Sequence, residues 1–289
     1  MEYRNNFEIT WLPLWKCNFK CPYCNGWKDT NALEFQPLNT LIEVWENLLN
    51  KIHYSHEEII VNITGGEPTI YPNIFKFIKY LTNKVTRIHI CSNLSFNADE
   101  FLNLKIPYDK ISFIATFHPS CISVNNFINN LITLKQYIEN NTVNFVADEN
   151  NLKKQEFFIK KINDCGIKTN PLLLKFFGQD LSKGTFVKKN FDNFETLNSK
   201  SELNVIKKLR NTQKIETCDN ESSKQVSFEK KCLAGYKYIQ IFPNGNIKKC
   251  SKDTTYLGNI FNGDIHLYEE PHRCKEKFCS FHYNLILND

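Results

Sequence analysis

The stretch Ile59-Ile-Val-Asn-Ile-Thr-Gly65-Gly66-Glu67-Pro68 begins with six mostly β-branched residues, which two glycines follow. β-Branched side chains favour strands, and glycines favour the turns that end them. Similar apolar runs recur along the first 178 residues. They predict strands at 7–15, 59–64, 85–91, 111–117, 142–147 and 167–177.

The segments between these strands contain apolar residues at helical spacing, at 41–52, 74–81 and 127–138. Strands that alternate with helices through right-handed crossovers favour a parallel sheet covered by helices, either open or curled into a partial barrel. We therefore predict an α/β fold, a partial (β/α)6 barrel, whose chemistry lies at the carboxyl ends of the strands.

The composition changes beyond the last predicted strand. Lys, Asn, Ser and Glu dominate residues 181–229, which we interpret as a connecting region between a barrel at 1–180 and a small domain at 230–289. In that domain, 236–242 alternates like a strand, 243–246 supplies a turn and 247–250 begins a return strand. We expect a β-hairpin flanked by cysteines.

Charge and cysteine content narrow the possible functions. The formal net charge of +5 is spread along 289 residues, so nucleic acid is an unlikely partner. The longest apolar runs fall far short of a membrane span, and the first residues do not lead into a signal-peptide core, so we expect a cytoplasmic protein. In that setting the eleven cysteines point to metal ligation more than to disulfides.

Three cysteines lie in the segment Cys17-Asn-Phe-Lys-Cys21-Pro-Tyr-Cys24, directly after the first predicted strand. Three thiolates at this spacing can bind three irons of a cubane 4Fe-4S cluster, and no fourth cysteine lies nearby in the sequence to take the last iron. A buried helix face and a zinc site are the alternatives. Asn18, Pro22, Asn25 and Gly26 oppose a helix here. Zinc requires a fourth ligand.

This segment resembles the signature of the radical S-adenosylmethionine (SAM) superfamily, C-x3-C-x2-C with an aromatic residue, here Tyr23, before the third cysteine. The resemblance implies that the open iron chelates SAM and that the reduced cluster splits SAM to a 5′-deoxyadenosyl radical, which abstracts hydrogen from the substrate. It also implies an electron donor of the flavodoxin or ferredoxin type.

A second resemblance lies one β/α unit later. Gly65, Gly66, Glu67 and Pro68 match the family's motif for the SAM amino group, where glycines allow close approach and a carboxylate receives the ammonium. Alone, this motif is equally typical of a turn at a strand end. By resemblance, further strand ends supply contacts to SAM or the substrate: Ser92, Asn93 and Thr116.

Candidate catalytic residues follow the fourth and fifth predicted strands: His118, Cys121 and Asp148. A lone histidine is often simply packed or solvated, and a free cysteine is often a small buried apolar residue. Cys121 would act as a hydrogen donor only in a redox-neutral epimerase.

A second cysteine group surrounds the predicted hairpin and follows it, at Cys232, Cys250, Cys274 and Cys279. Four thiolates can hold a second 4Fe-4S cluster or a structural zinc ion. The arrangement resembles the twitch and SPASM extensions of radical SAM enzymes, and the small number of cysteines favours a twitch-like domain with one auxiliary cluster. His272 and His282 flank the last pair and are alternative ligands.

These features predict an oxidoreductase. An auxiliary cluster can take an electron from a substrate radical, as in the cyclitol dehydrogenases of aminoglycoside biosynthesis, which this chain resembles. We expect a dehydrogenase that acts on a small molecule of the sugar or aminocyclitol type. The alternatives are an enzyme that modifies a short peptide, an epimerase, and a nonenzymatic metal-binding module.

Overall fold

The computed structural model describes residues 6–21, 24, 35–53, 58–138, 141–147, 152–166, 169–173, 225–253, 255–279 and 285–287. Tyr23, Asp148 and His282 lie outside the described residues, as does nearly all of the expected connecting region. The chain divides into two compact units that are discontinuous in sequence. The first unit comprises Met1–Leu14, Ala32–His89 and Asp219–Asp289, and the second comprises Trp15–Asn31 and Ile90–Cys218.

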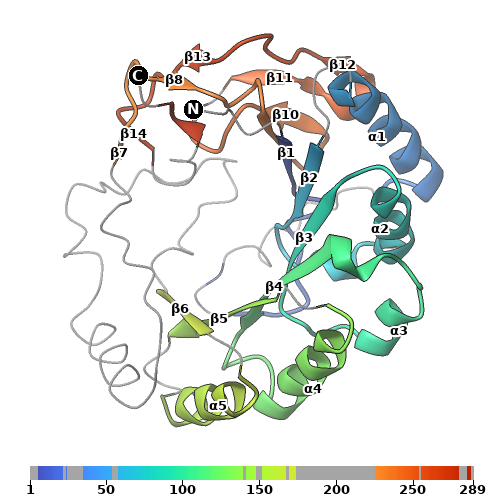
Figure 1. Cartoon of the computed structure of the whole chain (residues 1–289), viewed down its shortest axis with the longest axis vertical. Coiled ribbons are helices and arrows are strands. Elements are labelled where there is room, and N and C mark those ends of the chain that lie inside the picture. The colour runs from blue at the N-terminus through green and yellow to red at the C-terminus, as the bar shows by residue number, and fades with distance from the viewer. Residues whose placement is uncertain are drawn as a thin grey trace. The chain divides into compact units, whose positions relative to one another are not determined.

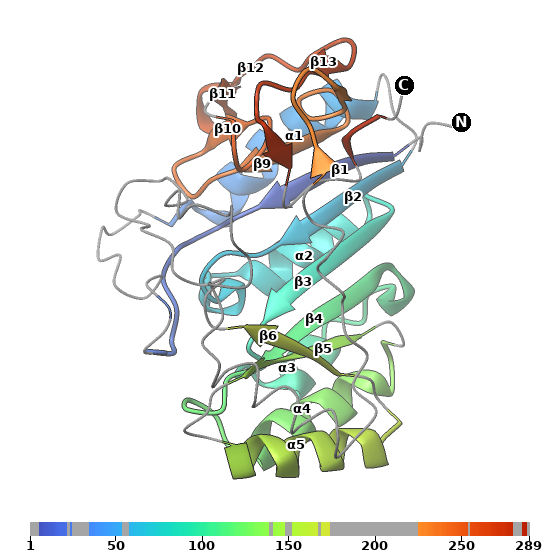
Figure 2. The ribbon, with the colours of Figure 1, turned by 90° about the vertical axis from the view of Figure 1, so that its left-hand side faces the viewer.

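The first unit contains one mixed sheet. Strand β1 (Asn6–Trp11) pairs in parallel with β2 (Glu58–Ile63) on one edge and with β9 (Tyr238–Ile241) on the other. The remaining strands, β10 (Asn246–Lys248), β11 (Tyr256–Asn259) and β12 (Asp264–Ile265), continue the sheet in antiparallel fashion. The hairpin β9–β10 thus extends the sheet of the N-terminal strand (Figure 2).

Two amphipathic helices bury their apolar faces in the first unit, α1 (Leu38–His53) and α2 (Ile74–Thr82). The ring of Trp11 meets Trp45 of α1 edge to face at 5.3 Å and Phe77 of α2 at 5.1 Å. Such aromatic pairs stabilise by about 0.5–1.5 kcal/mol beyond the area that they bury. The 3-10 helices η2 (Pro68–Ile70) and η8 (Ile260–Asn262) belong to the same unit.

The second unit contains the parallel strands β4 (Ile111–Phe117), β5 (Thr142–Ala147) and β6 (Thr169–Leu173). Its helices are η3 (Tyr108–Lys110), α3 (Ala98–Leu102), α4 (Val124–Lys135) and α5 (Leu152–Asp164). Helices α4 and α5 lie along one side of β4 and β5 (Figure 1). The rings of Phe117 on β4 and Phe158 on α5 stack with their centroids 4.1 Å apart, in the core between strand and helix.

Strand β3 (Arg87–Ser92) begins in the first unit and ends in the second. Four two-residue strands of the first unit complete the architecture. They form two antiparallel pairs, β8 (Lys231–Cys232) with β13 (His272–Arg273) and β7 (Gln225–Val226) with β14 (Phe278–Cys279). No helix among the described residues is long and apolar enough to cross a membrane.

The predicted fold class is confirmed. All six predicted strands are present, their pairings within each unit are parallel, and the predicted hairpin is β9–β10. Helices α3 and α5 also follow strands of the sheet, but no residue range was predicted for either of them from the sequence. We keep the domain boundaries at residues 180 and 230 as a proposal, because residues 174–224 lie outside the described part of the chain.

Candidate functional site

The loop after β1 places Cys21 against two side chains from the end of β4. The Cys21 sulfur is buried, and it lies 3.3 Å from Cys121 Sγ and 3.7 Å from His118 Nδ1. The sequence shows no fourth cysteine beside the triplet, but the fold brings Cys121 next to it. Sequence spacing gave no sign of this neighbour, which the fold supplies because the loop after the first strand meets the end of the fourth strand.

Cys17 is held by donors from its own loop and from the end of β3. The backbone N–H of Phe19 donates to Cys17 Sγ at 3.3 Å, and Asn93 Nδ2 donates to the same sulfur at 3.8 Å. Asn93 Nδ2 also donates to Asn18 Oδ1 at 3.0 Å, and Asn18 Nδ2 donates to Ser95 Oγ at 2.7 Å. Donors aimed at a sulfur favour its thiolate form, which is the form that binds metal.

Two of the expected SAM contacts lie at the end of β3, and the third lies on β4. Asn93 is buried beside Cys17, whereas Ser92 Oγ accepts from the backbone N–H of Leu94 at 3.0 Å and so stabilises its own turn. Thr116 lies within β4, opposite Asn144 of β5. Their roles toward SAM stay predictions.

His118 and Cys121 share one tight turn at the end of β4. The backbone N–H groups of Cys121 and Ile122 donate to the carbonyl of His118 at 2.9 and 3.2 Å, and Lys154 of α5 donates to the carbonyl of Pro119. Burial lowers the pKa of His118 to about 4, so its imidazole is neutral at neutral pH. A neutral ring beside Cys21 adds no charge to the cysteine site.

The Gly65–Pro68 motif forms a turn in the first unit. Gly65 has φ +119°, and a Cβ there would lie 2.5 Å from the carbonyl oxygen of Leu14, so the position requires glycine. Glu67 is buried, and its Oε1 accepts from the N–H and the hydroxyl of Thr69 at 3.1 and 2.6 Å. Glu67 therefore caps η2, which begins at Pro68. Its role toward the SAM ammonium stays a prediction.

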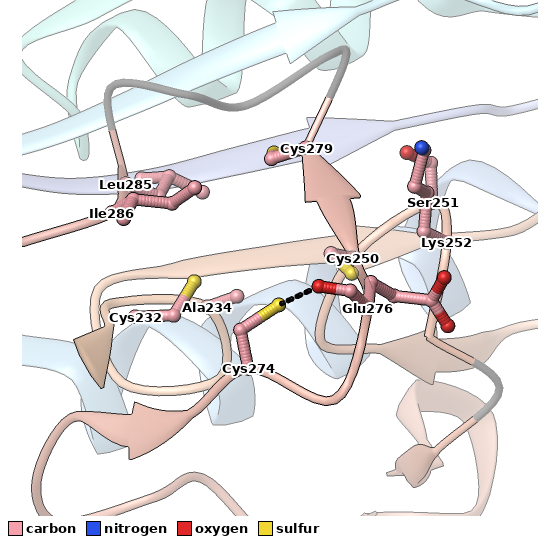
Figure 3. Close-up of a pocket in the computed structure, with 10 residues that line it drawn as sticks. All are labelled: Cys232, Ala234, Cys250, Ser251, Lys252, Cys274, Glu276, Cys279, Leu285 and Ile286. Atoms are coloured by element: carbon pink, nitrogen blue, oxygen red, sulfur yellow. Dashed lines mark hydrogen bonds between the residues drawn. The ribbon is translucent and has the colours of Figure 1, made fainter. Parts of the chain in front are cut away.

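The four C-terminal cysteines line one pocket of the first unit (Figure 3). Cys232 belongs to β8 and Cys279 to β14, while Cys250 and Cys274 follow β10 and β13. Apolar side chains complete much of the wall: Ala234, Leu285 and Ile286. His272 is exposed, and its ring stacks on Tyr268 at 3.9 Å, so it does not join the cysteines.

The pKa values of two cysteines in this pocket are raised, those of Cys232 and Cys250. Burial raises the pKa of Cys232 to about 11, and the other three cysteines add to that rise. Burial also raises the pKa of Cys250, and hydrogen bonds from the backbone N–H groups of Asp253 and Lys252 partly offset that rise. Four neighbouring thiolates would repel one another unless a positively charged group lay among them.

The donor set of the pocket fits a thiolate-bound metal group. The backbone N–H of Asp253 donates to Cys250 Sγ at 3.3 Å, and the hydroxyl of Ser251 is buried in the pocket wall with no partner among the described residues. No three His, Cys, Asp or Glu side chains of the described chain lie close enough together to hold a metal ion. Ligation therefore requires the sulfurs to converge from the arrangement in Figure 3.

An ion pair that sequence reasoning missed fixes the loop around Cys250. Lys249 Nζ lies 2.7 Å from Asp253 Oδ2, and both side chains are 9% exposed. Asp253 Oδ1 also accepts from the backbone N–H of Thr255 at 2.8 Å. The signal available in the sequence is opposite charges four residues apart, on either side of a predicted ligand.

Residues 15–147 match the family model of the radical SAM superfamily. They include the cysteine triplet, the Gly-Gly-Glu-Pro motif and the ends of β3 and β4. Residues 15–147 thus match a radical SAM domain, a family whose members use SAM and a 4Fe-4S cluster. A comparison with curated proteins found no match.

Solved radical SAM enzymes share the fold. The structure of native anSMEcpe with bound AdoMet and Cp18Cys peptide aligns with a TM-score of 0.57 and 14% identity, over 88% of this chain and 78% of that one. Streptococcus suis SuiB bound to precursor peptide SuiA aligns with a TM-score of 0.50 and 18% identity, over 90% of this chain and 63% of that one. BtrN in complex with AdoMet and 2-DOIA reaches a TM-score of 0.43 at 16% identity, over 90% of this chain and 80% of that one. We draw no conclusion from that last alignment.

Proposed function

We propose that this protein is a radical SAM enzyme in which Cys17, Cys21 and Cys24 hold the catalytic 4Fe-4S cluster. The observation that carries the proposal is the contact of this cysteine loop with the ends of two strands, through Asn93 and through His118 with Cys121. When bound, the cluster supplies the electron that cleaves SAM to a 5′-deoxyadenosyl radical. The residues of this chain position the cluster, SAM and the substrate.

The proposed SAM contacts divide between two kinds of group. Glu67 offers a fixed, buried carboxylate, which suits the SAM ammonium. Gly65 has no Cβ, and this allows the turn before Glu67 to pack against the carbonyl of Leu14. The buried amide of Asn93 is fixed beside Cys17, which suits a polar group of SAM near the cluster. Further proposed contacts are Tyr23, Gly66, Pro68, Ser92 and Thr116.

For the C-terminal region we propose a twitch-like domain with one auxiliary 4Fe-4S cluster on Cys232, Cys250, Cys274 and Cys279. The shared pocket, the raised pKa of Cys232 beside the other three cysteines and the hydrogen-bond donor at Cys250 support a bound metal group there. Zinc fits the same four ligands. Metal analysis of the purified protein distinguishes the two.

We propose that the reaction is the oxidation of a small molecule of the sugar or aminocyclitol type. The four protein ligands leave no iron of the auxiliary cluster open to substrate, which suits a role as electron acceptor. His118, Cys121 and Asp148 are the proposed groups at the substrate. A flavodoxin or ferredoxin-type protein is the proposed electron donor.

Modification of a short peptide is the second candidate. The two neighbours with TM-scores of at least 0.50 that are described above were crystallised with peptides. At 14% and 18% identity they share the fold with this chain, so they support peptide binding only as a function that this architecture can carry. Epimerisation is a variant of either reaction, with Cys121 as the hydrogen donor.

The first experiment measures iron and SAM cleavage in anaerobically reconstituted protein. We expect about eight irons per chain, from two four-iron clusters. Replacing Cys17, Cys21 and Cys24 together by Ala should halve the iron and abolish formation of 5′-deoxyadenosine, while the control Cys165→Ala should change neither. No SAM cleavage by the unaltered protein would refute the proposed enzyme, and stoichiometric zinc with about four irons would refute the auxiliary cluster.

A second experiment distinguishes oxidation from epimerisation once a substrate is in hand. In a dehydrogenase, Cys250→Ala should still form 5′-deoxyadenosine but lose the oxidised product, because the substrate radical has no electron acceptor. In an epimerase, Cys121→Ala should stop turnover after the first abstraction, and solvent deuterium should enter the product of the unaltered enzyme. If both variants turn over normally, neither mechanism holds.

A further inference from the structure

The contact between Cys21 and Cys121 joins two sulfurs that are 100 residues apart in the chain. Their separation of 3.3 Å exceeds a disulfide bond by roughly 1.2 Å, since the S–S bond length is about 2.05 Å. Closing that gap requires a change in the side-chain torsions of both cysteines. Both residues are free cysteines in this structure.

Both ends of this pair are fixed by backbone contacts within the second unit. Cys121 lies in the turn that the His118 carbonyl closes, and Lys154 anchors the same turn through Pro119. Cys21 is fixed from the other side, because its carbonyl accepts from the N–H of Cys24 at 3.1 Å. These hydrogen bonds fix the backbone on both sides of the pair.

Accessibility gives the two cysteines different roles. Cys21 is 3% exposed, whereas Cys121 is partly exposed. A soluble disulfide reaches Cys121 first, and Cys21 is then the neighbouring thiol that resolves the mixed disulfide. Redox-sensitive cysteines share this arrangement of an accessible thiol beside a resolving one.

We propose that Cys21 and Cys121 form a reversible disulfide when Cys21 is not bound to the cluster, with glutathione disulfide as the oxidant. The Cys121 thiolate attacks one sulfur of glutathione disulfide, which forms a Cys121–glutathione bond and releases one glutathione. The Cys21 thiolate then attacks Cys121 Sγ and displaces the second glutathione. Two protein thiols are oxidised, one glutathione disulfide is reduced to two glutathione molecules, and the protons of the two thiols pass to these products.

The disulfide has two consequences for the cysteine site. It removes one cluster ligand, so the oxidised protein cannot bind the catalytic cluster until a thiol reduces the bond. It also keeps Cys21 from irreversible oxidation to the sulfinic and sulfonic acids. These consequences rest on the proposed role of Cys21 as a cluster ligand, but formation of the disulfide does not.

The test uses the full chain, freed of iron by a chelator, reduced, and then treated anaerobically with glutathione disulfide. After alkylation, a tryptic digest without reduction is analysed by mass spectrometry. Cys121 is the only cysteine of the peptide 111–135, Cys17 is alone in 17–20, and Cys21 shares 21–28 with Cys24, so fragmentation assigns the last pair. We expect 21–28 linked to 111–135 through Cys21 as the main product.

Recovery of iron binding gives a second readout. Iron-free protein is exposed to glutathione disulfide, then to hydrogen peroxide, then reduced with dithiothreitol and reconstituted. Peroxide reaches the other cluster cysteines equally in all variants, so the comparison is relative. The unaltered protein and Cys165→Ser should recover more iron than Cys121→Ser, in which Cys21 has no disulfide partner. A main product that links Cys21 to Cys24, a glutathione adduct that persists on Cys121, or equal recovery in Cys121→Ser would overturn the proposal. Absence of SAM cleavage would refute the proposed enzyme and leave the peptide map unchanged.

Discussion

The ion pair between Lys249 and Asp253 yields a prediction that connects the packing of one loop to metal content. Asp253→Asn keeps an oxygen that can accept from the N–H of Thr255, but it removes the charge that Lys249 Nζ meets at 2.7 Å. Because both side chains are 9% exposed, the change leaves a nearly buried ammonium without its partner. Breaking a buried pair in this way costs about 3 kcal/mol or more, which is roughly a hundredfold in an equilibrium constant.

We expect this cost to appear as local opening of the loop that carries Cys250. Hydrogen exchange of iron-free protein should show faster exchange around residues 249–255 in Asp253→Asn. Reconstituted protein should lose the second cluster, so that its iron falls from about eight to about four per chain. The control is Lys84→Met, which breaks the exposed pair with Glu46 in the same unit and should change neither measurement. Unchanged exchange and full iron in Asp253→Asn would show that the pair does not hold this loop.

Three further changes test single side chains. Glu67→Gln should weaken SAM binding in a calorimetric titration without changing the iron content, because the ammonium loses a charged acceptor; equal affinity would refute the assignment. Ser251→Ala should lower the reduction potential of the auxiliary cluster at constant iron, because a buried hydroxyl that donates to a cluster sulfur stabilises the more negative reduced state; a potential that is unchanged or higher in a redox titration followed by electron paramagnetic resonance would argue against that contact. Gly65→Ala should reduce stability by roughly 1–3 kcal/mol from backbone strain, and by more through its 2.5 Å approach to the Leu14 carbonyl. In urea unfolding, Gly65→Ala should lose more stability than Gly166→Ala, whose added Cβ meets nothing within 4 Å. Equal losses of stability would contradict the clash.

The strands and the helices α1, α2 and α4 were predictable because their signals are local. Runs such as Ile59 to Ile63 contain β-branched residues, and the apolar face of α1 recurs at helical spacing, so each element is encoded in fewer than twenty residues. The cysteine triplet was equally readable, since its chelate spacing lies within eight residues. The pairing of β9 with β1 was not predictable, because no local feature tells a C-terminal strand which edge it will join.

The candidate sites show the same division. The sequence identified the four C-terminal cysteines as one group, and the structure places them around one pocket. It gave no sign that Ser251 is buried among them or that Lys249 and Asp253 are shielded from water. Burial of a polar side chain depends on what packs over it, and those residues come from several distant segments.

The sequence by itself determined the alternation of strands and helices, the cysteine spacing and, through them, the match of residues 15–147 to the radical SAM family. Only the tertiary structure decided that Cys121 meets Cys21, that Asn93 meets Cys17 and that β9 extends the sheet of β1. Spacing along the chain fixes which atoms one loop can offer to a ligand. The fold fixes which loops meet, because the carboxyl ends of strands far apart in sequence gather the side chains that follow them at one edge.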